Sequence, residues 1–169
     1  MNNLLIKLDS AGAVEWSVAA DTNASNETNI VIEDPSDNGF IVAAYEKDGA
    51  TQNYPDGNAW IYKVDANGNL VWSNVFGGDN DPVNSSDEFD DIIATSDGNF
   101  MAIGYAEGNS YTGGNGSFEC TLYKFDSNGN ILFARNIGNS NINYGQVIIE
   151  ASDGNFVIGG TEYNGSTLD

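Results

Sequence analysis

AWIYKVDANGNLVW, the segment at residues 59–72, has two short runs of β-branched and aromatic residues on either side of a tight turn at 65–69. The turn begins with Asp and contains Asn-Gly, which supplies the positive φ that tight hairpin turns require. Two further segments have the same plan, LLIKLDSAGAVEW at 4–16 and TLYKFDSNGNILF at 121–133. The sequence therefore predicts a β-hairpin that occurs three times.

Two independent markers give the length of the repeat. The lysine of the hairpin recurs after 56 and 61 residues, at Lys7, Lys63 and Lys124. A turn containing Ser-Asp and followed by Phe recurs after 60 and 56 residues, at 36–40, 96–100 and 152–156. We therefore predict a single domain over 1–169, made of three repeats at approximately 4–58, 59–118 and 119–169.

Each repeat contains four predicted strands, bounded by Gly, Asn and Asp. The first strands are expected at 29–33, 91–95 and 146–151, and the second strands at 40–45, 100–105 and 156–161. The third strand carries the lysine, and the fourth is expected at 14–18, 70–76 and 131–137. No window of about 11 residues or more has sustained helical periodicity, so the predicted fold class is all-β. Four antiparallel strands repeated at this interval are typical of the blades of a β-propeller.

The repeats are out of phase with the chain, which begins with third and fourth strands and ends with first and second strands. The prediction is three blades' worth of sequence, with two complete blades and one divided between the termini. Known propellers have about four to eight blades, so three cannot close, and open sheet edges promote aggregation. Either the chain is part of a longer propeller, or two copies pair head to tail in a six-bladed ring, which is the arrangement we favour. A contact that failed to close would instead give a filament.

A specific sequence pattern accompanies the repeat. The middle repeat contains Lys63-Val64-Asp65, Gly68-Asn69, Trp72 and Phe76-Gly77-Gly78, followed by TSDGNF at 95–100 and Gly104. This pattern resembles the SBBP-type β-propeller repeats of bacterial and archaeal secreted or cell-surface proteins. The first repeat departs from it most, with Ala13 in place of Asn, and the third has Phe133 in place of Trp. The resemblance implies extracellular display or adhesion and brings no catalytic residues.

The composition excludes several classes of partner. Lys and Arg number 5 against 25 Asp and Glu, and the formal net charge is −20. A surface this acidic repels phosphates, so we expect neither nucleic acid nor an anionic membrane as a partner. The chain has no His, the commonest general base, which argues against an enzyme. No run approaches the roughly 18 apolar residues of a membrane span. The start, Met1-Asn2-Asn3, lacks the features of a signal peptide, so the expected extracellular or cell-surface location rests on the resemblance.

One predicted long loop is rich in acids and is the candidate metal site. Its carboxylates are Asp79, Asp81, Asp87 and Asp90, with Glu88 and Asp91 beside them. Ca²⁺ takes about six to eight oxygen ligands, and such a cluster could supply them. No EF-hand pattern is present, so the alternative is a solvated acidic loop without metal. Calcium is the only cofactor that the sequence suggests.

A candidate ligand surface follows from the propeller hypothesis, which places all long connections on one face and all tight turns on the other. The face with the long connections would carry the acidic loop and four tyrosines, Tyr54, Tyr111, Tyr144 and Tyr163. Aromatic side chains beside acids and amides are a candidate surface for a carbohydrate or protein ligand, because loops on a rigid scaffold carry most binding functions. The alternative is that the tyrosines pack against their own loops.

The remaining repeated residues are assigned structural roles. A buried lysine needs a partner, so we expect each hairpin lysine to pair with a repeat Asp such as Asp37, Asp97 or Asp153, and not to form an anion-binding ring. The aromatic residues of the fourth strands, Trp16, Trp72 and Phe133, are predicted to be core between blades. Cys120, the lone cysteine, is predicted to be a small buried hydrophobe.

Three functions are compatible with these observations. The first is a non-catalytic binding or adhesion module that uses the face with the long connections. The second is a self-assembling structural subunit whose function is the strand-completing contact. The third is a carboxylate-based glycosidase, for which we expect the least support because the chain has no His and its acids lie in loops.

Overall fold

A computed structural model describes residues 3–20, 25–47, 57–76, 87–107, 118–138 and 142–163, and the regular structure in these residues is entirely β-strand. The strands, in chain order, are β1 (Asn3–Leu8), β2 (Val14–Ala20), β3 (Ser25–Glu33), β4 (Phe40–Lys47), β5 (Gly57–Val64), β6 (Leu70–Phe76), β7 (Glu88–Ala94), β8 (Phe100–Glu107), β9 (Phe118–Phe125), β10 (Ile131–Ile137), β11 (Ile142–Glu150) and β12 (Phe156–Tyr163). The described residues contain no helix that is long and apolar enough to cross a membrane.

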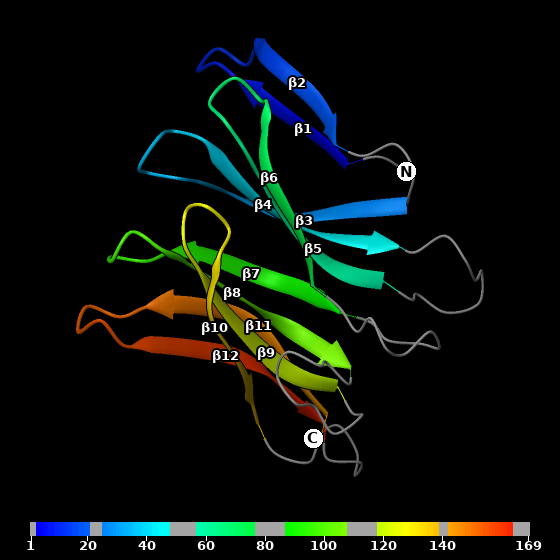
Figure 1. The fold of residues 1–169 in the computed structure, drawn as a ribbon, viewed down its shortest axis with the longest axis vertical. Coiled ribbons are helices and arrows are strands. Elements are labelled where there is room, and N and C mark those ends of the chain that lie inside the picture. The colour runs from blue at the N-terminus through cyan, green and yellow to red at the C-terminus, as the bar shows by residue number, and fades with distance from the viewer. Residues whose placement is uncertain are drawn as a thin grey trace.

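The strands form four antiparallel sheets (Figure 1). Two sheets have four strands each, in the orders β3-β4-β5-β6 and β7-β8-β9-β10, and two have only two strands each, β1-β2 and β11-β12. In Figure 1 the sheets follow one another down the long axis of the molecule in chain order, with β1-β2 at the top and β11-β12 at the bottom. The two-stranded sheets therefore lie at opposite ends of an open stack.

The hairpin turns form because one carboxylate organises the backbone of each. Asp65 accepts hydrogen bonds from the N–H groups of Asn67 and Asn69, at 2.8 and 2.9 Å, and Gly68 has a φ of 84°. Asp9 and Asp126 accept the corresponding bonds in the other two hairpins. A residue with a side chain is strained at such a φ, so the glycine is required for the turn.

Each first strand contains a β-bulge at the same place. The register with the second strand shifts around one extra residue, which is Asn29 in β3, Asp90 in β7 and Gln146 in β11. Because the bulge recurs in three strands of different sequence, it is a property of the repeat and not of one residue.

The core lies between the sheets. Ile41 and Ile61 of the β3-β6 sheet pack against Phe100 and Tyr123 of the β7-β10 sheet, and all four side chains are buried. A second cluster joins Leu5 of β1 to the β3-β6 sheet, and a third joins Ile148 of β11 to the β7-β10 sheet. Both faces of each four-stranded sheet are therefore covered by a neighbour, as expected from strands that are apolar on both faces.

The all-β prediction is confirmed, and each predicted strand is found. Strands β6 and β10 have the predicted bounds, whereas β3 and β11 each begin four residues earlier than expected. The polar residues at 25–28 pair with β4 through the backbone, and that pairing does not depend on apolar side chains. The predicted clustering of the long connections on one face falls largely on residues outside the described ranges.

Candidate functional site

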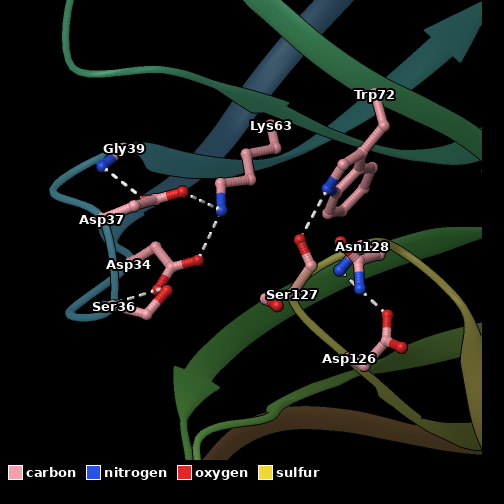
Figure 2. A network of polar contacts seen from close by, with 9 residues as sticks. All are labelled: Asp34, Ser36, Asp37, Gly39, Lys63, Trp72, Asp126, Ser127 and Asn128. Atoms are coloured by element: carbon pink, nitrogen blue, oxygen red, sulfur yellow. Dashed lines mark hydrogen bonds and ion pairs between the residues drawn. The ribbon is translucent and has the colours of Figure 1, made fainter.

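A buried lysine ties β5 to the turn between β3 and β4 (Figure 2). The Lys63 side chain is 3% exposed, and its Nζ lies 2.6 Å from Oδ2 of Asp34 and 2.7 Å from Oδ2 of Asp37. The turn holds both carboxylates in position. Asp34 accepts bonds from the N–H and hydroxyl of Ser36, and Asp37 accepts one from the N–H of Gly39. The lysine thus fixes the turn between β3 and β4 against β5.

Hydrogen bonding outweighs the cost of burying these charges. Burial alone raises the pKa of Asp34, but bonds from Lys63 and Ser36 leave that pKa below its ordinary value. Burial alone lowers the pKa of Lys63, but its bonds to Asp34 and Asp37 leave that pKa raised. Both partners are therefore charged at neutral pH, and removal of either would leave the other charge buried without compensation.

The lysine contact recurs in the next sheet and is changed at the start of the chain. Lys124 lies 2.5 Å from Oδ2 of Asp97, so the predicted pairing with a repeat Asp is confirmed for Lys63 and Lys124. It is wrong for Lys7 in the single chain, because Lys7 lies 2.8 Å from Glu15 on its own hairpin. The remaining turn, which carries Asp153, joins β11 to β12 at the opposite end of the stack.

A tryptophan on two of the three fourth strands, β2 and β6, ties its sheet to the hairpin turn of the following sheet. Trp16 Nε1 donates to the carbonyl of Ala66 at 2.9 Å, and Trp72 Nε1 donates to the carbonyl of Ser127 at the same distance. Figure 2 shows Trp72 pointing across to the turn that contains Ser127. Trp16 and Trp72 also pack against the clusters between their sheets, which agrees with the predicted core role.

Glycine gives these rings room to approach the turn. A Cβ placed on Gly68 would lie 3.0 Å from the ring of Trp16, and one placed on Gly129 would lie 3.0 Å from the ring of Trp72. Gly12 occupies the same position in the first hairpin with nearly the same φ of 82°, yet it has no heavy atom within 4 Å of such a Cβ. The first turn is therefore built like the others but is not covered by a ring from the described residues.

On β10, the fourth strand of its sheet, the aromatic residue is Phe133. It is partly buried against the cluster of Met101, Ile103 and Ile148. Its place in the register is that of Trp16 and Trp72, because each of these three residues lies opposite a hairpin lysine. The sheet that follows it, β11-β12, has no third and fourth strands among the described residues, so Phe133 has no turn of that kind to contact.

The two ends of the stack carry open strand edges and exposed apolar side chains. In the described chain β1 pairs only with β2 and β12 only with β11, whereas β5 and β8 each pair on both sides. Leu4, Ile6 and Leu8 of β1 are 61%, 46% and 53% exposed, and at the other end Val147, Ile149 and Val157 are similarly exposed. Large exposed apolar patches mark interaction surfaces.

Only two of the four candidate calcium residues, Asp87 and Asp90, are among the described residues. Asp79 and Asp81 lie outside the described residues. Asp87 is buried, and Asp90, at the bulge of β7, is partly buried. Burial, followed by the charges of Glu88 and Asp91, raises the pKa of Asp90 to about 6. The described ranges contain no group of three or more acidic, His or Cys side chains placed to hold a metal ion.

Two of the four candidate ligand-face tyrosines, Tyr54 and Tyr111, also lie outside the described residues. Tyr163 is 48% exposed at the end of β12. Tyr144 belongs to an aromatic group with Tyr105 and Phe118, with ring centroids 5.0 and 5.7 Å from its own. Tyr105 donates its hydroxyl to Glu88 at 2.7 Å. The structure thus brings one predicted tyrosine together with two aromatics that the sequence did not single out, and with Glu88, which the sequence analysis placed beside the acidic loop.

The structure also identifies connecting residues that the sequence analysis missed. Asp34 is a second acceptor for Lys63, and Asp91 accepts a bond at 2.9 Å from the N–H of Ile148 on the neighbouring sheet. Glu150 accepts bonds from the N–H and hydroxyl of Ser96 in the turn between β7 and β8. Asp34 had a detectable signal, since its turn is one residue longer than the equivalent turns. Cys120 is buried, which confirms the prediction of a small buried hydrophobe, and burial raises its pKa to about 11.

Comparison with protein-family models and with curated proteins found no match to this chain. The resemblance to SBBP-type repeats stays a prediction.

Proposed function

We propose that the chain is a non-catalytic, extracellular β-propeller module that assembles with a second copy by strand completion. In this proposal the β3-β6 and β7-β10 sheets are whole blades, and β1-β2 and β11-β12 are two halves of a further blade. Two copies joined head to tail give a six-bladed ring, which lies within the known range of about four to eight blades.

One observation carries the proposal. Inside each four-stranded sheet the third strand pairs with the second, as β5 pairs with β4 and β9 with β8. The strands that lack this neighbour in the described chain are β1, in the third position, and β12, in the second position. The two open edges are therefore of the types that pair with each other, and both of these sheets carry exposed apolar side chains, as β6 and β10 of the whole sheets also do.

Light scattering on the purified chain tests the assembly. The chain mass is 18.0 kDa, and we expect a stable species of twice that mass. A ladder of larger species would contradict the closed ring and indicate an open filament instead. A folded monomer would contradict strand completion between copies and favour a longer propeller in which another segment fills the edges.

A matched pair of substitutions shows whether the open faces are responsible. Val157 of β12 and Val71 of β6 are 56% and 54% exposed, but only Val157 lies on a two-stranded sheet. We expect Val157→Lys to abolish the dimer and Val71→Lys, with the same change in charge, to leave it intact.

A ligand-binding role for the assembled module is the second part of the proposal, supported by the aromatic group of Tyr105, Phe118 and Tyr144 beside Glu88. A glycan array tests it, with Tyr144→Ala as the variant that should lose binding. Melting with and without chelator tests calcium separately, and an unchanged melting temperature would contradict a structural Ca²⁺ site.

A further inference from the structure

We infer that the contact between copies has a defined register and two side-chain joints: Lys7 pairs with Asp153 of a second copy, and Phe133 of that copy covers the turn at Gly12. This inference rests on the proposed assembly and specifies the partner of each residue.

The backbone register follows from the two whole sheets. Residue Ile41 lies opposite Lys63 in the β4-β5 pair, and Met101 lies opposite Lys124 in the β8-β9 pair. The equivalent residue of β12 is Val157, because each of these three residues directly follows the Phe that begins its strand. The register therefore places Val157 opposite Lys7 and Ile158 opposite Ile6 of the second copy.

The lysine contact is the most specific support. Asp37, Asp97 and Asp153 each accept a hydrogen bond at Oδ1 from the N–H two residues later, so their carboxylates are held in the same way. Oδ2 of Asp37 and of Asp97 then accepts a lysine, whereas Oδ2 of Asp153 accepts the side-chain N–H of Asn155 at 2.8 Å and contacts no lysine of the described residues. The β12-β1 register brings Lys7 to the position from which Lys63 and Lys124 reach their aspartates.

The exposure of the three lysines agrees with a missing partner at the first. Lys63 and Lys124 are 3% and 15% exposed, and Lys7 is 38% exposed. Its present partner, Glu15, is itself 43% exposed and lies on the neighbouring strand of the same hairpin. An exposed pair of this kind contributes little, so it offers little resistance to exchange for Asp153.

The uncovered turn is the second joint. Each whole sheet presents its hairpin turn to the aromatic residue of the preceding sheet, Gly68 to Trp16 and Gly129 to Trp72. In the ring, the sheet that precedes β1-β2 is the β7-β10 sheet of the second copy, whose aromatic residue at this position is Phe133. Phenylalanine covers the glycine but has no N–H to donate to the turn carbonyl, so this joint is apolar only.

The exposed faces fit the same arrangement. Leu4, Ile6 and Leu8 occupy the places of Trp60, Tyr62 and Val64, which are 6%, 0% and 1% exposed because a preceding sheet covers them. Val31 of β3 is 48% exposed at a place where its equivalent Ile92 is buried, since no first strand precedes it in the chain. The register places Ile149 and Val157 of the second copy on the face toward Val31.

Charge reversal tests the lysine joint. We expect Lys7→Glu and Asp153→Lys each to weaken the dissociation constant of the dimer about tenfold or more, and the double variant to recover to within about threefold of the wild type. Glu15→Gln is the matched control and should leave the dimer unchanged or slightly tighter. A double variant no better than the single variants, in a chain whose wild type dimerises, would overturn the Lys7–Asp153 joint.

Disulfide trapping tests the register. Ile6→Cys with Ile158→Cys should give a covalent dimer under oxidation, and Leu4→Cys with Ile158→Cys, two residues out of register, should not. Trapping of the second pair but not the first would overturn the register while leaving strand completion intact. A wild-type chain that is monomeric by light scattering would overturn the proposed assembly itself, and this inference with it.

Discussion

The first hairpin, β1-β2, and the middle hairpin, β5-β6, have the same sequence plan but very different surroundings. Tyr62 is completely buried, whereas Ile6 at the equivalent position is 46% exposed. Lys63 reaches two carboxylates of the adjoining turn, whereas Lys7 reaches one glutamate on its own hairpin. The local fold of the hairpin is thus a property of its sequence, and its burial is a property of what lies on either side.

This difference shows which interactions belong to the repeat and which belong to the array. The backbone hydrogen bonds to Asp9 and Asp65 are the same in both hairpins. The lysine–aspartate contact joins the third strand to the turn between the first and second strands, so it requires the whole sheet. The ring–glycine contact is made between sheets, so it requires a neighbour. The first hairpin keeps the first kind and lacks the second, and it makes the ring–glycine contact through Trp16 on the following sheet but not at its own turn.

The largest expected difference between the two hairpins is in the lysines. We expect Lys63→Met to lower the free energy of unfolding by about 3–5 kcal/mol, because Asp34 would remain buried and charged without its cation. Lys7→Met should cost less than about 0.5 kcal/mol in the monomer, since its ion pair is exposed. Urea denaturation at neutral pH, at a concentration where the chain is monomeric, measures both. Equal losses would show that exposure does not distinguish the two sites.

A smaller difference is expected at the hairpin glycines. Gly12→Ala should cost about 1 kcal/mol, the strain of a side chain at positive φ. Gly68→Ala carries the same strain and must also displace the ring of Trp16, so we expect about 2–3 kcal/mol. Thermal unfolding of the two variants side by side gives the comparison. If both melt at the same temperature, the ring contact at Gly68 contributes nothing.

Replacement of Trp72 by phenylalanine gives the β3-β6 sheet the same aromatic residue that the β7-β10 sheet has at Phe133. The variant loses the hydrogen bond to the Ser127 carbonyl and some buried ring surface, and we expect a loss of about 1–2 kcal/mol. Phe133→Trp is the reciprocal control and should not destabilise the monomer, because its ring has no turn to contact there. A neutral Trp72→Phe variant would mean that the indole hydrogen bond adds no stability.

The smallest expected effect concerns the bulge residue Asp90, whose equivalents are the neutral Asn29 and Gln146. The folded chain holds the Asp90 proton more tightly than the unfolded chain does, since its pKa is raised from 3.8 to about 6. This group's contribution to stability therefore decreases as the pH rises from about 4 to about 6 and stays low above that.

We expect Asp90→Asn to stabilise the chain by on the order of 1 kcal/mol at pH 7 and by nothing near pH 4, allowing for partial exposure of the site. Chelator in all samples removes any contribution of bound calcium. A gain that is the same at both pH values would assign the effect to packing and not to charge.

The strand positions could be predicted because most strands have Asp, Asn or Gly beside their ends and contain a run of β-branched and aromatic residues. The pairing of Lys63 with Asp37 was also predictable, since a buried lysine needs a carboxylate and the repeat supplies one. Asp34 was missed because it lies two positions before the recurring Ser-Asp motif, with Pro35 between them. The predicted aspartate partner of Lys7 was wrong for the single chain. The spacing of the repeats does not show that β1 lacks a second strand, and the turn before it, within the described chain.

The candidate ligand site was far less predictable. Tyr144 was selected as an exposed loop residue, but it lies within β11 and packs against Tyr105 and Phe118 of the neighbouring sheet. Contacts of this type join residues about 40 positions apart through the stacking of sheets. The acids Asp87 and Asp90 were grouped because they are close in sequence, but among the described residues they belong to no group of three or more acidic, His or Cys side chains placed to hold a metal ion.

The tryptophan–turn joint has a consequence for how such chains change in length. Its donor and acceptor belong to successive repeats, Trp16 with Ala66 and Trp72 with Ser127. Duplication or deletion of one whole repeat in the gene would therefore leave every remaining joint with its proper partner. A lineage built on this hairpin could thus alter its number of units in single genetic events, without evolving any new contact between them.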